Sequence, residues 1–397
     1  QGVAQVTGSV VITGWNIETG QEVLSIPCAQ LSGGLGGGSM TEVESLKVSK
    51  DGTSLFASVT SLRHGSFSLS GSSSLKRWDL STGNFVGEVV VGQISAGVAQ
   101  SGGTILGKLL QAKDGKSLFG VLTSSRLKGF RVAGAESVVQ YASDDFTQLR
   151  VIPLVTASMG FGGGQCGTIG DVKQTKDGRL LLVAVGSMQQ QFFTMRGHTS
   201  IVKLDLFSGQ EVGRITVGAS LAQMFSGQSV ELTSLMVGRD GVSLFGAVTH
   251  GVQPGIAALT VASFIIQWNI ENGAVVKSIQ TGMSFVRMGF GSQKQKGTRY
   301  EKVKQSRDGK SLIGCMMQVE QQGFSVNTAT WLVKWDVETG SELGRAQVGS
   351  GAQQGMSVNM SDLTDIMISR DGTSLIGIFT SMASSARMGA PECCSIM

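Results

Sequence analysis

The chain has 397 residues, of which 57 are glycine, 4 are proline and 15 % are charged, and its formal net charge is +4 at pH 7. High glycine with so little proline excludes collagen, and a hydrophobic content of 41 % excludes a disordered chain. The small positive charge gives little reason to expect nucleic acid as a partner. Many short strands joined by tight turns fit this composition.

Two short signatures recur along the chain with a regular period. The first is a basic residue followed by Asp-Gly, and its aspartates lie 63 residues apart except for one interval of 68: Asp51, Asp114, Asp177, Asp240, Asp308 and Asp371. The second signature begins with tryptophan and ends with glycine five residues later, 27 or 28 residues after the aspartate. Its copies begin at Trp78, Trp268 and Trp335, with Tyr141 and Leu204 at the same offset in the second and third units. Trp15 begins a further copy that no Asp-Gly precedes.

Each repeat predicts four strands, which we call A to D. Strand A ends at the Asp-Gly pair, a favoured signal for a two-residue hairpin turn, and strand B is the apolar run after it. Strand C ends at the tryptophan position, and a second tight turn leads to strand D. Alternating, β-branched residues favour strands over helices. The predicted units cover approximately residues 41–92, 104–155, 167–218, 230–282, 298–349, and 362–381 together with 8–28.

The order Asp-Gly, strand, Trp-Asp, Thr-Gly, strand resembles the WD40 repeat and is similar to YVTN-type propellers. This resemblance implies an all-β fold, a single six-bladed β-propeller of four-stranded antiparallel blades over residues 1–397. Trp15 lacks the first half of a blade and Asp371 lacks the second half, so the N-terminal strands are expected to complete the C-terminal blade and close the ring. The period of 63 is longer than the 40–45 residues of a WD40 repeat, and no Gly-His dipeptide precedes strand A.

The extra length of each repeat falls in the B–C and D–A connections, which alternation of strand direction places on one face. We expect long loops there, among them residues 32–40, 160–166 and 289–293, and long loops on a rigid scaffold commonly bind partners. The predicted partner face is basic and suits an acidic protein. Its residues are Arg63, His64, Arg126, Lys128, Arg131, Arg196, His198, Arg287, Lys294 and Lys296.

Polar residues recur six positions before each repeat aspartate, in the order Ser45, Lys108, Asp171, Ser234, Lys302 and Asp365. The repeated order serine, lysine, aspartate indicates a duplicated three-blade unit. Strand A is the innermost strand of a propeller blade, so we expect ion pairs near the channel between Lys108 and Asp171 and between Lys302 and Asp365. Their structural role would be to set the register of neighbouring blades, because an unpaired buried charge costs several kcal/mol.

The sequence offers no catalytic or cofactor motif. His64, His198 and His250 lack the spacing of metal ligands, no nucleophile elbow occurs, and no glycine-rich stretch matches a phosphate loop. We therefore expect no cofactor, no metal and no enzymatic activity. The favoured function is a protein-interaction scaffold or a subunit of a larger assembly. Two alternatives stay open: a secreted or surface structural subunit of a polymer, and a propeller-type hydrolase or lactonase with a site in the channel.

The location of the protein is left open by the sequence. Five cysteines, mostly scattered, favour reduced thiols and an intracellular protein, while one Asn-x-Ser sequon at Asn359 suits the secreted alternative. The C-terminal four residues, beginning at Cys394, fit a prenylation motif, so a lipid anchor there is a further alternative. The longest uncharged run, residues 251–270, is broken by proline and glycine and is a poor membrane span.

Overall fold

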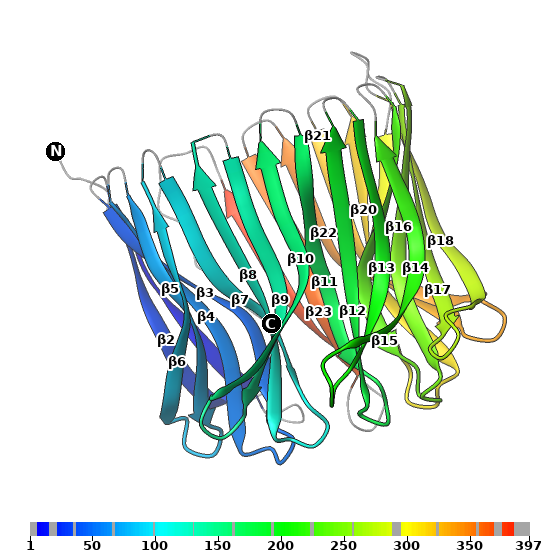
Figure 1. Ribbon diagram of the computed structural model, residues 1–397. Helices are drawn as coiled ribbons and strands as arrows, with labels where there is room; N and C mark the ends of the chain where they lie inside the picture. The colour runs from blue at the N-terminus through cyan, green and yellow to red at the C-terminus, as the bar shows by residue number, and fades with distance from the viewer. Residues whose placement is uncertain are drawn as a thin grey trace. The chain divides into compact units, whose positions relative to one another are not determined.

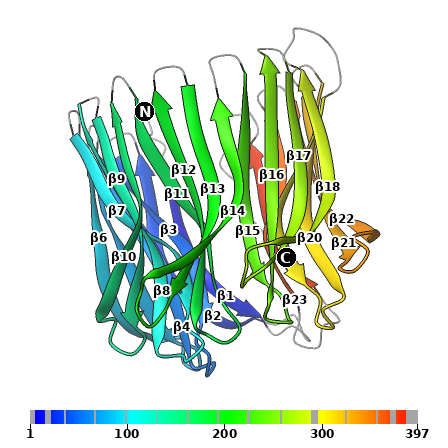
Figure 2. The same cartoon turned by 45° about the vertical axis from the view of Figure 1, so that its right-hand side comes forward.

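The computed structural model describes residues 6–15, 22–34, 37–65, 68–97, 100–129, 131–160, 163–191, 194–222, 226–255, 258–287, 295–322, 325–354, 357–368 and 375–384. The chain divides into two compact units, unit 1 over Gln1–Gln174 and unit 2 over Thr175–Met397. Figures 1 and 2 show their strands as long arrows from two directions. Nothing helical in the described part of the chain has the length and apolarity needed to cross a membrane.

Unit 1 contains two complete four-stranded antiparallel sheets. Strands β3 to β6 form the first, β7 to β10 form the second, and β1 pairs with β2 along its whole length. The strands of this unit are β1 (Val6–Trp15), β2 (Glu22–Gly34), β3 (Gly37–Val48), β4 (Ser54–Gly65), β5 (Leu69–Asp79), β6 (Phe85–Ala96), β7 (Gln100–Gln111), β8 (Ser117–Lys128), β9 (Arg131–Ala142), β10 (Gln148–Gly160) and β11 (Gly163–Gln174).

Unit 2 repeats this arrangement. Strands β15 to β18 and β19 to β22 form antiparallel sheets of four, β12 to β14 pair in sequence order, and β23 pairs with β24. The strands are β12 (Leu180–Gln191), β13 (Thr194–Asp205), β14 (Glu211–Ala222), β15 (Gly227–Val237), β16 (Ser243–Gly255), β17 (Ala258–Asn269), β18 (Val275–Arg287), β19 (Gln295–Gln305), β20 (Ser311–Gln322), β21 (Ser325–Asp336), β22 (Glu342–Gln354), β23 (Ser357–Ile368) and β24 (Leu375–Ser384). The prediction of antiparallel strands is confirmed.

The long repeat period comes from long strands, and the expectation of long loops is wrong. Strands of 10 to 13 residues, such as β2 and β10, are about twice the usual five or six. Only two residues separate Gly34 from Gly37, where β3 begins, and only two separate Gly160 from Gly163, where β11 begins. The third expected loop, residues 289–293, lies outside the described residues.

Consecutive sheets are joined at one end only. The last residues of each fourth strand pair with the first strand of the following sheet, as Ile94 pairs with Gly103 and Ala96 with Ser101. The same short pairing joins β14 to β15 and β22 to β23. Away from this end the sheets separate, so apolar side chains can fill the space between them.

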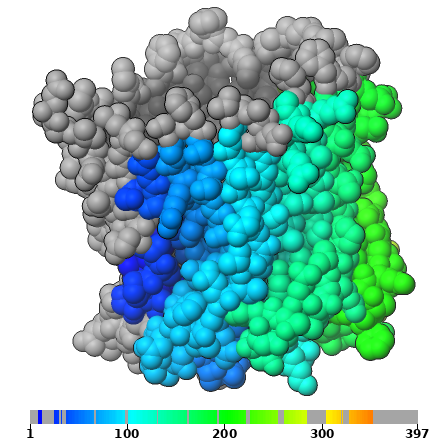
Figure 3. Space-filling model, turned by 60° about the vertical axis from the view of Figure 1, so that its left-hand side comes forward, coloured from blue at the N-terminus to red at the C-terminus, as the bar shows by residue number. Residues whose placement is uncertain are grey.

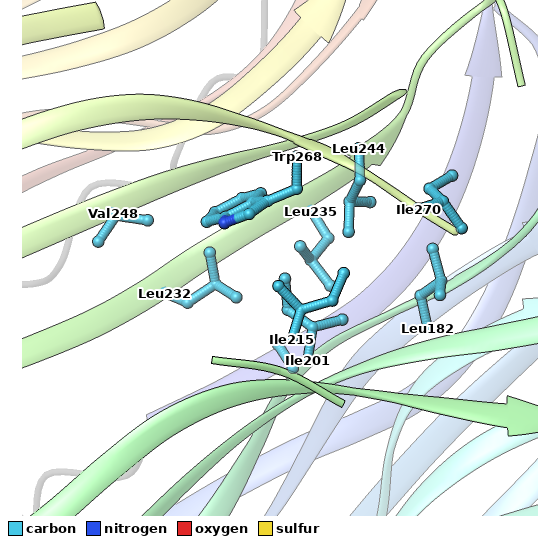
Figure 4. Close-up of a cluster of buried hydrophobic side chains, with 10 residues drawn as sticks. Leu182, Ile201, Ile215, Leu232, Leu235, Leu244, Val248, Trp268 and Ile270 are labelled. Carbon is cyan, nitrogen blue, oxygen red and sulfur yellow. The ribbon is translucent and has the colours of Figure 1, made fainter. Parts of the chain in front are cut away.

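The hydrophobic core lies between neighbouring sheets. In unit 2, Leu182 and Ile201 of one sheet meet Leu232, Leu244 and Trp268 of the next in a single buried cluster (Figure 4). In unit 1, an equivalent cluster joins Phe56 and Leu75 of the first sheet to Leu118 and Tyr141 of the second. Successive four-stranded antiparallel sheets packed face to face in this way make the fold β-propeller-like.

The tryptophan position of the repeat is buried in every described copy. Trp78, Trp268 and Trp335 are at most 3 % exposed, and Tyr141 and Leu204, which replace tryptophan, are 2 % and 1 % exposed. Gly246 lies against Trp268, where an added Cβ would come within 2.8 Å of the indole ring. The side chain at the end of strand C therefore holds the core together even where its identity has changed.

The Asp-Gly turn differs in detail from the predicted two-residue hairpin. The N–H of Gly52 donates to the carbonyl of Ser49, so Lys50 and Asp51 are the central residues and Gly52 follows them with φ 78°. The N–H of Ser49 donates to the carbonyl of Ser54, so the closing pair encloses residues 50–53 in a four-residue hairpin loop, in which Gly52 takes the left-handed position. The Asp51 carboxylate accepts hydrogen bonds from Ser49 Oγ, Thr53 Oγ1 and Thr53 N–H.

In the five repeats whose second turn the structure describes, glycine takes the left-handed region at this turn, with one exception. Gly83, Gly209, Gly273 and Gly340 have φ between 71° and 75°, whereas Phe146 occupies this position in the second repeat with φ 61°. A bulky residue in this region carries backbone strain. The Phe146 ring is buried and meets Phe56 edge-on at 6.1 Å between ring centroids, so packing offsets the strain.

Substitutions at Phe146 separate packing from strain. Phe146→Ala loses the ring and keeps a Cβ at positive φ, so it should destabilise unit 1 by about 3 kcal/mol or more. Phe146→Gly loses the same ring but removes the strain, so its cost should be about 1 kcal/mol smaller. Urea unfolding followed by circular dichroism gives both values, and equal costs for the two variants would contradict the strain.

The turn aspartates predict loss of stability in acid. Hydrogen bonds from Ser49 and Thr53 lower the pKa of Asp51 to about 2, and hydrogen bonds within the turn also lower the pKa of Asp79, Asp177 and Asp308. Because the unfolded chain binds protons at about pH 4, the contribution of these groups is complete above that pH and is lost as the pH falls towards about 2. Asp51→Asn should flatten this part of the stability profile, as measured by urea unfolding between pH 5 and pH 2. An unchanged slope would show that Asp51 does not contribute.

Candidate partner-binding groove

A polar groove of about 760 Å³ lies at the end of unit 1 where consecutive sheets are joined. Strands β6, β7, β8 and β9 line it, and Figure 3 shows the surface of this region in cyan tones. The lining residues are Gln93, Ser95, Ser101, Gly102, Gly103, Thr104, Ser124, Ser125, Arg126, Leu127, Lys128, Ala133 and Gly134. The groove thus combines two predicted partner-face residues with a lining rich in hydroxyl groups.

Small neighbours give Arg126 its room in the groove. Arg126 on β8 lies directly opposite Gly102 on β7 and Ala133 on β9. Residues directly opposite in an antiparallel sheet share a face, so no large side chain stands beside the guanidinium on either strand. An arginine in this setting can present its planar group to a carboxylate in bidentate fashion.

The groove is positively charged. Lys128 lies directly opposite Arg131 at the tip of the β8–β9 hairpin, two residues beyond Arg126. All three side chains are exposed, and none of the lining residues is acidic. The Ser124 hydroxyl donates to the carbonyl of Ala135 within the hairpin, so Thr104, directly opposite Ser124, and the exposed Ser125 supply the further hydroxyl donors of the groove. This combination attracts anions and can hydrogen-bond to them.

Arg63 and His64 lie at the tip of the neighbouring hairpin of unit 1. Both are exposed residues of β4, opposite Ser70 and Leu69 on β5. The strand beside them carries acid, because Glu42 and Glu44 lie on β3. Burial and the nearby Glu42 carboxylate raise the pKa of Glu44. The surroundings of Arg63 and His64 in the first repeat therefore include acidic side chains, whereas the groove lining in the second repeat has none.

In unit 2 the predicted face residues also belong to strands. Arg196 and His198 are exposed on β13, and Ser187 Oγ lies 3.0 Å from His198 Nδ1 across the hairpin. Arg287 ends β18, and Lys296 lies on β19 opposite Phe285. Lys294 lies outside the described residues.

The predicted pair Lys108 and Asp171 is brought together in unit 1. Lys108 Nζ lies 4.0 Å from Asp171 Oδ1, and it also donates to the carbonyl of Gly170. A bulge between Leu106 and Leu109 contains Lys108, and a bulge re-aims a side chain towards a neighbouring strand. Lys173 is the closer partner, with its Nζ 2.9 Å from the same carboxylate oxygen.

The structure describes the other predicted polar positions in less detail. Lys302 on β19 and Asp365 on β23 each follow a similar bulge, at Tyr300/Lys302 and Leu363/Asp365. Their side chains lie outside the described part of the structure. Ser45 Oγ accepts a hydrogen bond from the N–H of Leu109 at 3.1 Å, which links β3 to β7.

The three histidines are divided between the units, with His64 in unit 1 and His198 and His250 in unit 2. His250 lies on β16 rather than in a loop, edge-on to Phe264 at 5.3 Å between centroids, and burial lowers its pKa. Among the described residues, no group of three His, Cys, Asp or Glu side chains is arranged to hold a metal ion. Cys394, the candidate for prenylation, lies outside the described residues.

The hydroxyl lining of the groove was not predicted. Ser101, Thr104, Ser124 and Ser125 stand in strands whose serine and glycine content hides the alternation that marks a strand. The signal that could have revealed it is the position of Ser124 two residues before Arg126, because alternate residues of a strand lie on the same face of the sheet.

Comparisons with known proteins give weak likenesses. No protein-family model matches the chain, and no curated protein matches it. Among solved structures it is similar to prolyl oligopeptidase B from Galerina marginata bound to a 25mer macrocyclization substrate, with a TM-score of 0.37 and 9 % identity over 86 % of this chain and 47 % of that one. A second structure of that enzyme, bound to a 35mer hydrolysis and macrocyclization substrate, gives a TM-score of 0.36 at 9 % identity, with 86 % and 46 % covered. The WD40 domain of SCAP from fission yeast gives a TM-score of 0.20 at 7 % identity, with 77 % and 86 % covered.

These findings correct one expectation. The chain spans about half the length of the prolyl oligopeptidase B structures that it matches, 47 % and 46 %. The prediction that it is not an enzyme is contradicted, because structures of a peptidase are among its neighbours. At 9 % identity and a TM-score of 0.37, the likeness assigns no activity to this chain.

Variants of the Lys108–Asp171 pair test what the pair contributes. The Lys108 side chain is 46 % exposed, so Lys108→Met should change the free energy of unfolding by less than about 1 kcal/mol. The Asp171 side chain is 12 % exposed and also accepts the N–H of Val172, so Asp171→Ala should cost about 1–3 kcal/mol. Urea unfolding measures both, and equal costs would show that Lys108 is the main partner of the carboxylate.

Proposed function

We propose that this chain is a protein-interaction module, a six-bladed propeller that binds an acidic segment of a partner protein in the groove beside Arg126 and Lys128. In this proposal β1 and β2 complete the blade that β23 and β24 begin. The pairing within each half supports it. β1 and β2 pair along their length as third and fourth strands do, and β23 and β24 pair as first and second strands do.

The charge of the groove carries the proposal. Arg126, Lys128 and the adjacent Arg131 gather within one hairpin, and no acidic side chain lines the groove to neutralise them. Carboxylates of a partner would meet charge-assisted donors from the three basic side chains and neutral donors from Ser101, Thr104 and Ser125. The groove is lined by the ends of long strands, which hold these donors in place without a folding step on binding.

The lining favours a peptide over a nucleic acid. None of the lining residues is aromatic, so the groove offers no ring on which a base could stack. Its small residues, Gly102, Gly103 and Gly134, place no side chain in the groove, which leaves room for an extended peptide chain. An acidic, extended segment of a partner protein is therefore the ligand that this chemistry fits.

Charge reversal in the groove tests the proposal. The probe is a fluorescein-labelled peptide of twelve residues that alternates glutamate and serine, and binding is followed by fluorescence anisotropy. The wild-type chain should bind it, and the variant Arg126→Glu/Lys128→Glu should bind at least about tenfold more weakly, because each lost charge-assisted contact is worth about 1.5 kcal/mol or more. A peptide with glutamine in place of glutamate should not bind.

A matched control distinguishes the loss of the groove's own charges from a change in the net charge of the chain. Lys116→Glu/Arg179→Glu changes the net charge by the same amount at exposed residues of two Asp-Gly turns, and its affinity should stay near that of the wild type. Equal weakening in both double variants would contradict a groove-specific site, and so would an absence of binding by the wild-type chain.

A further inference from the structure

The fourth strand of each sheet has an open edge. β6 pairs with β5 along its length, but β7 pairs only with its last three residues, from Ile94 to Ala96. Residues 85–93 of β6 therefore have a strand neighbour on one side only in this sheet. The same holds for most of β10, β14, β18 and β22. Open edges can pair with strands of other molecules, and proteins commonly block them with proline, charge or polar side chains.

The outward face of the fourth strands can be compared position by position. Seven residues after the turn position that Gly83 and Phe146 occupy, five of the six fourth strands carry a blocking or polar residue: Pro27, Pro153, Thr216, Gln280 and Gln347. Proline removes a backbone donor, and the polar residues favour water over an apolar neighbour. β6 carries Val90 at this position, 51 % exposed.

β6 is apolar on both faces. Its inward residues Val89 and Val91 pack against the core of unit 1. Its outward residues Val86 and Val90 are 53 % and 51 % exposed, and Phe85 at the start of the strand is 55 % exposed. A β-branched, apolar strand with a free edge is costly to leave in water.

The one charge on β6 is already balanced within the chain. Glu88 is the only charged residue of the strand, and its carboxylate lies 3.6 Å from Lys76 Nζ on β5. The edge is therefore electrically neutral, so neither a basic nor an acidic partner gains from it. A second neutral, apolar edge strand is the complement that fits, and an identical β6 has this composition.

We propose that β6 is a self-association edge, on which β6 of a second copy of this chain pairs antiparallel about a two-fold axis. Two-fold pairing lets the same strand supply both the donors and the acceptors of the new ladder. Like charges directly opposite each other are unfavourable, so the axis lies away from Glu88 and towards Val90. With the axis at Val90, residues 87–93 pair with each other, and these seven residues span about 24 Å, a small contact, so we expect a dimer that dissociates on dilution.

Sedimentation of the full chain tests this inference. The wild type should show a concentration-dependent dimer over about 1–100 μM, the range that a small interface of this kind implies. Val90→Lys places a charge on the paired edge and should weaken the dimer at least about tenfold. The matched control is Thr216→Lys, at the same position of β14, which should leave the dimer unchanged. Circular dichroism establishes that each variant is folded before it is compared.

Cross-linking supplies an independent readout. A photoreactive benzophenone side chain in place of Val86 should form covalent dimers whose cross-linked peptides both contain β6. A wild type that is monomeric at 100 μM would overturn the inference. So would a dimer that Val90→Lys leaves intact, or cross-links from β6 to any other segment. The groove shares Gln93 with this edge, but neither Val86 nor Val90 lines it, so these results do not bear on peptide binding there.

Discussion

Within each unit, neighbouring sheets depend on one another, because each covers the apolar face of the other. The side chain that ends the third strand stands at this contact: Trp268 closes over the core of unit 2, and Tyr141 does the same in unit 1. Burial of one aromatic side chain of this size contributes several kcal/mol, more than any surface ion pair of the chain can. Tyr141 and Leu204 could therefore replace tryptophan without loss of the repeat, provided that the position stayed buried.

Basic side chains then fix how neighbouring sheets line up. Arg239 Nε donates to the carbonyl of Ser306 at 2.7 Å, and Lys50 and Lys176 donate to the carbonyl of the residue 63 positions later. Lys203 reaches the carbonyls of Ile270 and Glu271 in the same manner. A cation held by carbonyls of the next sheet keeps its hydrogen bonds only when the two sheets are in register. This gives a structural role to the basic residues that stand before Asp51, Asp177 and Asp240.

The sequence predicted those parts of the fold that depend on a few residues at fixed spacing. The repeat, the place of Trp78 and its substitutes at the end of strand C, and the turn glycine at Gly83 all carry such a signal. Strand length was not predictable in this way. Beyond the core, strands such as β12 end in residues like Gln189 and Gln190, where no apolar alternation remains because the side chains there have nothing to cover. Backbone pairing continues regardless, since it needs no particular side chain.

The candidate site likewise combines features that could be predicted from the sequence with features that could not. Arg126 and Lys128 were predicted from their charge and their place between two strands, whereas the hydroxyl lining depends on strand register. Register also decides that Arg126 faces Gly102 and Ala133, which gives the guanidinium its space. A change of one residue in register would turn Arg126 to the other face of the sheet. The groove is therefore a product of the extended hairpins and would not exist if these segments were loops.

Amide hydrogen exchange across β8 and β9 tests this account most directly. If the added length of each repeat is hydrogen-bonded strand, the amides that form the β8–β9 ladder should exchange slowly up to the last pair, Lys128 and Arg131. Peptides covering residues 121–135 would then show protection close to that of residues 117–121 in the core. Fast exchange from residue 123 onward would contradict the account, because it would make the hairpin tip a loop and leave the groove without a fixed wall.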